Sequence, residues 1–282
     1  MIAAIPSPST GVYHVGPLTL HMYGVMLLLA IAGAIWLGGR RWVSWGGDWD
    51  LMFRIAVWGV IAGIVGARIY HLITNWEDPA IHAHWYGPFA VWEGGLGVWG
   101  GITLGVLVGA VIVRRSGNSV RLMMDAVAPG LLLAQGIGRW GNYFNQELYG
   151  KATSLPWGLK IDARPGQTFH PTFLYEFIWD ILGVLFLLWV DRRFKLRRPA
   201  LFALYVMVYT AFRTFEETLR IDESHHFLGQ RINFWVSLAL FVASTLFFVW
   251  WQFRRPEHKE PERRPRPIPK GPTMSVPRGR VR

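Results

Sequence analysis

Residues 18–38 read LTLHMYGVMLLLAIAGAIWLG, an apolar stretch whose first basic neighbours are Arg40 and Arg41. In a helix, about 20 such residues cross the roughly 30 Å of hydrocarbon in a bilayer. The pattern recurs, and we expect further spans at 51–73, 94–113, 122–139, 172–190, 199–216 and 232–253. The sequence therefore predicts an all-α integral membrane protein with about seven transmembrane helices.

The composition of the chain supports this class. Of its 282 residues, 52% are apolar and 17% are charged, whereas soluble domains average about 45–50% apolar and about 25% charged residues. The absence of cysteine excludes a disulfide framework and a thiolate metal site. Since the sequence also has no metal-ligand cluster and no nucleotide-binding motif, we expect neither a metal nor a cofactor.

The net charge of +11 comes from basic residues that are segregated between the apolar spans, as membrane topology requires. It does not indicate a nucleic-acid partner. With these spans, 20 of the 29 Lys and Arg fall on one side of the membrane and five on the other. Basic loops stay in the cytoplasm, so we expect the N-terminus outside and the C-terminus inside. Residues 1–253 would form the membrane domain, and residues 254–282, with seven prolines and ten basic residues, a disordered cytoplasmic tail.

Small residues recur along two of the expected spans. Gly59 and Gly63 are four residues apart in the second span, and Gly101, Gly105 and Gly109 repeat that spacing in the third. Glycines on one helix face let two backbones approach closely in lipid. We expect these two spans to pack through these faces.

The first polar cluster at membrane depth is GRWGNYFNQE at 138–147. If Arg139 begins a helical turn, Asn142 shares its face, and Glu147 follows Tyr143 by four residues. A guanidinium beside amides suits a phosphodiester, because it can donate two parallel hydrogen bonds to phosphate oxygens. The alternative is an Arg–Glu pair that only anchors a helix end.

Two further polar clusters lie near the ends of later spans. Arg213, Glu217 and Arg220 share one helix face, where two arginines beside one glutamate would leave positive charge for an anion; the alternative is a structural ion-pair network. His170 opens the fifth span and could exchange protons near neutral pH, or only cap the helix. Tyr23 and Asp125 are single polar residues that could line the same cavity.

In this order and spacing, the clusters resemble the prolipoprotein diacylglyceryl transferase family of bacterial inner membranes. Residues 138–147 are similar to the family signature, a Gly-Arg-x-Gly-Asn followed by aromatics, Asn and Glu. The resemblance covers residues 14–253. Further matching motifs are Gly16-Pro17, His21-Met22-Tyr23-Gly24, Trp92-Glu93-Gly94-Gly95-Leu96, His170-Pro171-Thr172 and Leu174-Tyr175-Glu176.

The resemblance implies an enzyme with two substrates. Members transfer the diacylglyceryl group of phosphatidylglycerol to the lipobox cysteine thiol of a preprolipoprotein; a thioether forms and glycerol phosphate leaves. The expected partners are therefore phosphatidylglycerol, the preprolipoprotein signal peptide and membrane lipid. The expected location is a bacterial cytoplasmic membrane, crossed several times, with the active site facing outward.

Matching positions imply roles for individual residues. Arg139 and Arg213 would bind the phosphate, while Asn142, Glu147 and Glu217 would orient the headgroup and the arginines. The remaining substrate-binding candidates are Tyr23, Asp125, His170, Arg220 and Arg68, the last matching a family arginine to which no role can be given.

The sequence departs from the family pattern at Trp99. Many members have a histidine there, often proposed to deprotonate the thiol, and indole cannot accept a proton. A glutamine that usually follows His-Pro-Thr is replaced by Phe173. The proton acceptor stays open between Glu147, Glu217, Asp125 and His170, or the arginines ionise the thiol through their field.

Two alternative functions belong to other classes. A transporter or flippase for an anionic phospholipid could line its path with the same arginines, but the chain shows no internal repeat. A structural scaffold would not need Arg139 and Arg213 in apolar surroundings.

Overall fold

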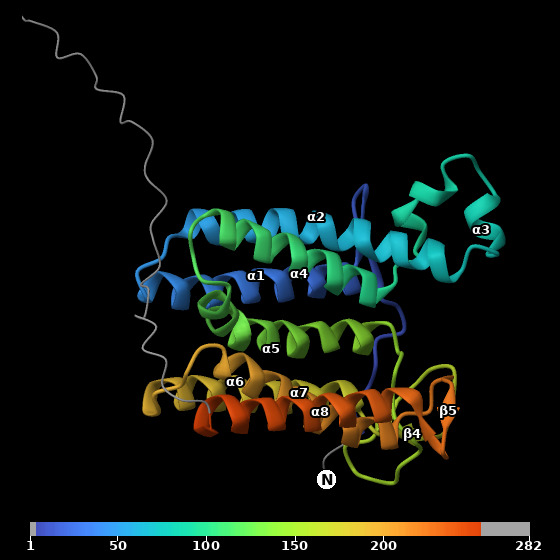
Figure 1. The fold of residues 1–282 in the computed structure, drawn as a ribbon. Helices are drawn as coiled ribbons and strands as arrows, with labels where there is room; N and C mark the ends of the chain where they lie inside the picture. The colour runs from blue at the N-terminus through green and yellow to red at the C-terminus, as the bar shows by residue number, and fades with distance from the viewer. Residues whose placement is uncertain (1–3, 255–282) are drawn as a thin grey trace, which may run out of the picture. The chain divides into compact units, whose positions relative to one another are not determined.

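A computed structural model describes residues 4–254, apart from the side chains of Ala80 and Glu93, and the chain divides into two compact units. Of the described residues, the first unit holds 4–41 and 121–254, and the second holds 42–120. The predicted helical fold is confirmed (Figure 1). The expected tail lies outside the described residues, except for Arg254.

Five long helices and three short hairpins build the first unit. The helices are α1 (Met22–Ser44), α5 (Val120–Phe144), α6 (Thr172–Arg193), α7 (Ala200–Leu219) and α8 (Ile232–Val249), which continues into a π-helical turn at Trp250–Arg254. The antiparallel hairpins pair β1 (Val12–Val15) with β2 (Leu18–His21), β3 (Leu159–Lys160) with β4 (Thr168–Phe169), and β5 (His226–Phe227) with β6 (Gln230–Arg231).

The second unit is a pair of long helices joined by an irregular loop. Its elements are α2 (Trp49–Thr74), α3 (Pro79–His82), the 3₁₀ turns η1 (Gly87–Phe89) and η2 (Val91–Glu93), and α4 (Val98–Arg115). Asp48 caps α2, since its carboxylate accepts a hydrogen bond from the backbone nitrogen of Leu51 at 2.8 Å. α2 and α4 pack against each other along their length.

Six of the seven long helices in the described chain are long and apolar enough to cross a membrane. The seventh, α7, has 20 residues but carries Arg213, Glu216 and Glu217 in its last turns. The first span begins later than expected, at Met22, because residues 18–21 pair with residues 12–15 as a hairpin instead of joining the helix. The alternation of Leu18, Thr19, Leu20 and His21 fits a strand as well as a helix.

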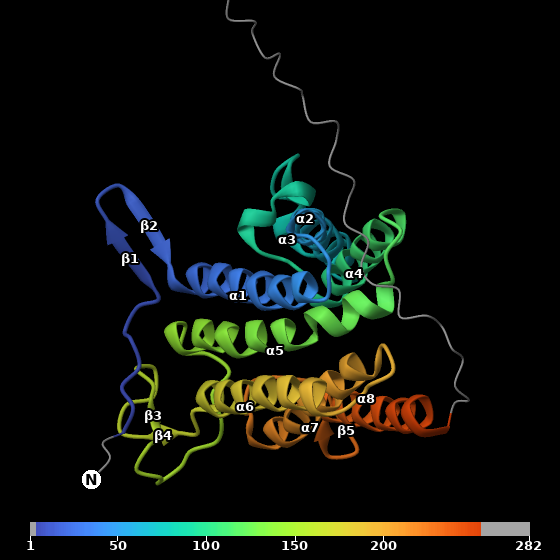
Figure 2. The same cartoon turned by 90° about the vertical axis from the view of Figure 1, so that its left-hand side faces the viewer.

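Helix α5 lies between α1 and α6 in the first unit (Figure 2). A Cβ atom on Gly130 of α5 would lie 2.7 Å from the carbonyl oxygen of Ala34 in α1, and one on Gly136 would lie 3.1 Å from Cβ of Asp180 in α6. Leu132 of α5 joins a buried cluster with α6 and α7, whose other members are Val184, Leu187, Val190, Leu201 and Leu204. These contacts fix α5, which carries Arg139, between its neighbours.

The glycine faces predicted for the second and third spans meet in the second unit. A Cβ atom on Gly101 would lie 3.1 Å from the carbonyl oxygen of Gly63, and one on Gly105 would lie 3.1 Å from that of Gly59. The two helices approach most closely at Gly100 and Gly66, where a Cβ on Gly100 would lie 2.2 Å from the carbonyl oxygen of Gly66. A side chain at Gly100 therefore requires the two backbones to separate.

We predict that Gly100→Ala lowers the stability of the protein in detergent by about 1–3 kcal/mol, the usual cost of overpacking a tight contact. Gly59→Ala is the matched control, since its added methyl would meet only the carbonyl oxygen of Gly105 at 3.9 Å. Both changes favour the helix intrinsically, so thermal unfolding of the two variants isolates the backbone contact. Equal unfolding temperatures would contradict this account.

Candidate active site

Three helices of the first unit bring two arginines to one carboxylate. Arg139 of α5 places Nη2 2.7 Å from Oε1 of Glu176 in α6, and Arg213 of α7 places Nη1 3.7 Å from Oε2 of the same glutamate. Glu176 is fully buried. The two arginines that the sequence singled out are 74 positions apart in the chain, and Glu176 joins them in the fold.

Helix α7 supplies two more carboxylates to Arg213. Glu216 and Glu217 follow it by three and four residues, and each forms an ion pair with its guanidinium. Both glutamates are 2% exposed, so their charges need partners inside the protein. Helical spacing places both carboxylates beside the arginine.

A second group of charged side chains surrounds Glu217. Arg231 donates from Nε to Oε2 of Glu217 at 2.6 Å, and Arg220 lies 3.7 Å from Oε1. Both arginines also bind Asp222, with Nε of Arg220 and Nη2 of Arg231 each 2.7 Å from its carboxylate. Partial burial alone would raise the pKa of Asp222, but the hydrogen bonds from Arg220 and Arg231 outweigh it and lower that pKa.

These contacts overturn the expectation of spare positive charge on the Arg213, Glu217 and Arg220 face. The outer quartet of Glu217, Asp222, Arg220 and Arg231 has two charges of each sign. The inner quartet likewise balances, and its members are Arg139, Arg213, Glu176 and Glu216. The sequence pattern did not indicate Glu176, Glu216 or Arg231 as residues of the site.

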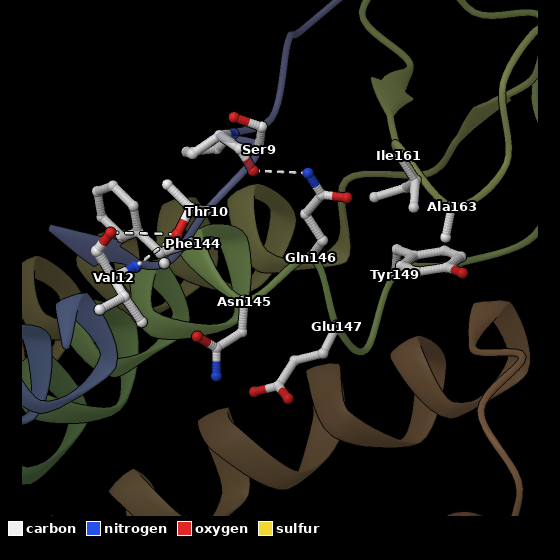
Figure 3. A pocket seen from close by; sticks show the side chains of 12 residues that line it. Ser9, Thr10, Val12, Phe144, Asn145, Gln146, Glu147, Tyr149, Ile161 and Ala163 are labelled. Atoms are coloured by element: carbon white, nitrogen blue, oxygen red, sulfur yellow. Dashed lines mark hydrogen bonds between the residues drawn. The ribbon is translucent and has the colours of Figure 1, made fainter.

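Asn142 and Glu147 extend the inner quartet toward a pocket. Arg139 donates from Nη1 to Oδ1 of Asn142 at 3.3 Å, and Asn142 donates from Nδ2 to Oε1 of Glu147 at 2.8 Å. The pocket measures about 450 Å³ and opens to solvent. Glu147 and Asn145 project from the same side of the chain beside it (Figure 3). Arg139 is thus connected to the pocket through one amide and one carboxylate.

One wall of this pocket is formed by residues 8–12, which lead into the first hairpin and include the first residue of β1. Gln146 secures that wall by donating from Nε2 to the carbonyl oxygen of Pro8 at 2.6 Å, while its Oε1 accepts from the nitrogen of Asp162 at 2.9 Å. Gly11 packs closely against the end of α5, since an added Cβ would lie 2.9 Å from Oδ1 of Asn145 and 3.0 Å from the carbonyl oxygen of Phe144. The predicted motif therefore builds the wall as well as the charged centre.

Two other predicted residues lie in the first unit near this end of α5. The ring of Tyr23 packs on Gly141, whose added Cβ would lie 2.7 Å from Cδ2 of the tyrosine; this places Tyr23 beside the turn that carries Asn142. His170 is separate from the charged network, and its Nδ1 lies 3.2 Å from the hydroxyl of Tyr175.

Asp125 lies apart from Arg139, although both belong to α5. Their separation of 14 positions corresponds to about 21 Å along a helix. Asp125 is fully buried; it accepts from the backbone nitrogen of Phe202 at 2.8 Å and pairs with Arg198 at 3.2 Å. Asp191 links the same Arg198 to Arg41 at 3.1 Å on each side. These contacts form a clamp between α1, α5, α6 and α7.

Arg68 belongs to the second unit and binds backbone. Its guanidinium donates to the carbonyl oxygens of Gly87, Pro88, Gly94 and Gly95. It is buried in this position, so it holds the loop between α2 and α4 in shape. Trp99, where the sequence departs from the expected pattern, also lies in this unit, at the start of α4.

We predict that Asp125→Asn destabilises the protein by about 3 kcal/mol, at the lower end of the cost of breaking a buried ion pair. Thermal unfolding in detergent measures the effect. Asp50→Asn is the control, because its pair with Arg54 is exposed and worth little. An unchanged Asp125→Asn protein would exclude the clamp as a stabilising element.

The lowered pKa of Asp222 gives a second, pH-dependent prediction. Because its folded pKa lies below its unfolded value of about 3.9, its ionisation stabilises the fold above that value and ceases to do so as the pH falls through the folded pKa. We expect Asp222→Asn to unfold at lower temperature than the native protein at pH 7, and the difference to narrow below about pH 4. A difference that widens in acid would contradict the assignment.

Comparison with known proteins gives one family. The family described as prolipoprotein diacylglyceryl transferase matches residues 10–250. Similar proteins include phosphatidylglycerol–prolipoprotein diacylglyceryl transferase 1 of Streptomyces coelicolor, 47% identical over 90% of this chain and 76% of its own length. Two further relatives are named phosphatidylglycerol–prolipoprotein diacylglyceryl transferase. The one from Cutibacterium acnes is 46% identical over 89% of this chain and 88% of its own length, and the one from Frankia alni is 49% identical over 87% of this chain and 67% of its own length.

Proposed function

The chain belongs to the prolipoprotein diacylglyceryl transferase family, and on that premise we propose that Arg139 and Arg213 hold the phosphodiester of phosphatidylglycerol during the reaction. The activity of the protein is diacylglyceryl transfer from phosphatidylglycerol to prolipoproteins. The observation that carries the assignment is the meeting of two arginines from different helices at one buried carboxylate.

In the proposed reaction, the cysteine thiolate of the lipobox attacks the glyceryl carbon next to the phosphate. A carbon–sulfur bond forms, the carbon–oxygen bond breaks, and its electrons pass to the phosphate oxygen of the departing glycerol phosphate. Arg139 and Arg213 stabilise the charge that develops there. Their carboxylate partners support this role by holding the two guanidinium groups in fixed orientations.

The pocket beside Glu147 receives the part of the substrate that projects from the phosphate. Its walls offer hydroxyl and amide groups from Ser9, Thr10 and Asn145, which suit the hydroxyls of a glycerol headgroup. The Asn142–Glu147 connection to Arg139 supports a headgroup site next to the phosphate site. Tyr23, beside the same turn, would line the approach.

Among the proposed acceptors for the thiol proton, Glu147 has the most support. Both oxygens of Glu217 are engaged by arginines, and Asp125 is about 21 Å along α5 from Arg139. His170 lies next to Tyr175. Glu147 uses Oε1 for Asn142, and its carboxylate lines an open pocket where a peptide thiol could reach it.

We propose that this site faces the outer side of a bacterial cytoplasmic membrane. Within the first unit, the network lies at the end of α5 and α7 that is opposite the basic residues Arg41 and Arg198. Basic residues favour the cytoplasmic side. An outward site also suits a substrate peptide that has been exported.

We predict that Arg139→Ala reduces transfer at least about 100-fold, the usual effect of removing one group that stabilises transition-state charge. Purified protein in detergent is given phosphatidylglycerol and a lipobox peptide, and the peptide mass is measured. The product should gain one diacylglyceryl group, and a peptide with serine in place of cysteine should gain nothing.

Two controls accompany that assay. Arg54→Ala removes an exposed arginine whose ion-pair partner in the described structure is Asp50, and this variant should transfer normally. Arg139→Lys keeps the charge but not the two parallel donors, and it should recover only part of the rate. Full activity of a folded Arg139→Ala protein would refute the phosphate assignment.

A further inference from the structure

Glu176 and Glu216 come from different helices and meet at one nitrogen of Arg213. Oε2 of Glu176 lies 3.7 Å from Nη1, and Oε2 of Glu216 forms an ion pair with that same nitrogen. The two carboxyl groups therefore approach the same guanidinium nitrogen from two helices. Ionised carboxylates only accept hydrogen bonds, so a hydrogen bond between the two groups forms only once the pair has taken up one proton.

The charge balance of the inner quartet indicates that this proton is needed when the phosphodiester binds. With both glutamates ionised, Arg139 and Arg213 are fully neutralised, and the resting site has no net charge. When a phosphodiester binds, it adds one further negative charge to the buried inner quartet. A net charge in such surroundings is costly, and one proton on the glutamates restores neutrality.

Charged and titratable neighbours on the surrounding elements do not supply the missing positive charge. Glu217 on α7 is already balanced, together with Asp222, by Arg220 and Arg231. Asp180, one turn after Glu176 on α6, is fully buried, and neither of its oxygens has a hydrogen-bond partner in the described structure. A neutral acid at this position avoids an unpaired buried charge. The remaining neighbours are the phenols of Tyr205 and Tyr209 on α7.

Glu176 has room for the proton. Oε1 lies 2.7 Å from Nη2 of Arg139, whereas Oε2 receives no hydrogen bond from any described residue and lies 3.7 Å from Nη1 of Arg213. A lone pair on Oε2 therefore remains open to a proton shared with Glu216. The outer quartet differs, because arginines donate hydrogen bonds to both Glu217 and Asp222.

We propose that Glu176 and Glu216 form a proton-sharing pair that takes up one proton when the lipid phosphodiester binds to Arg139 and Arg213. The inference rests on the proposed function, since it takes the two arginines as the phosphate site. Glu216 is then a positioning residue that makes lipid binding pH-dependent. Above the pH at which the free pair is fully ionised, each unit of pH weakens lipid binding about tenfold, as uptake of one proton requires.

Calorimetric titration counts the protons directly. Phosphatidylglycerol is titrated into the purified full-length protein in a neutral detergent at pH 7.5, in two buffers with different ionisation enthalpies. We expect uptake close to one proton per lipid bound for the native protein. Glu216→Gln, which mimics the protonated acid, should bind lipid with uptake near zero and with a Kd that stays constant with pH.

Two further variants complete the experiment. Glu176→Gln tests the other member of the pair and should also abolish uptake, while Glu223→Gln removes an equal charge outside the network and should behave as the native protein. Native binding without proton uptake, or unchanged uptake in Glu216→Gln, would overturn the proton-sharing pair. Equal lipid affinity of Arg139→Ala and the native protein would instead refute the phosphate site itself.

Discussion

A guanidinium group that enters the interior of a membrane-spanning bundle must find negative charge there, and Arg139 finds it in Glu176. That single ion pair ties α5 to α6 and places a carboxylate where α7 can present Arg213. The remaining charges of the site follow from it, because each added arginine or glutamate needs a partner of its own. The result is two balanced quartets, one centred on Arg213 and one on Glu217.

The sequence was informative where interactions are local. Apolar length predicted the long helices, and spacings of three and four residues predicted that Asn142 would contact Arg139 and that Glu217 would contact Arg213. The glycine faces of α2 and α4 were also predictable, because four-residue spacing marks a packing face in lipid.

What the sequence could not give was tertiary pairing. Glu176 belongs to a different helix from either arginine, so no spacing within one helix connects it to them. Asp125 and Arg139 share a helix, yet the intervening residues put them at its two ends, where Asp125 meets Arg198. The hairpin at residues 12–21 escaped prediction because its second strand is apolar enough to continue the span.

The wall that Gln146 secures has a consequence for biogenesis. Ile5 pairs with Gly158 and Lys160 through backbone hydrogen bonds of 2.9 Å, and Pro8 accepts from Gln146. These partners lie 138–155 positions later in the chain than the residues they bind. Residues 5–8 therefore leave the ribosome long before the residues that hold them, and a nascent chain has no complete substrate pocket until α5 and the loop after it have been synthesised.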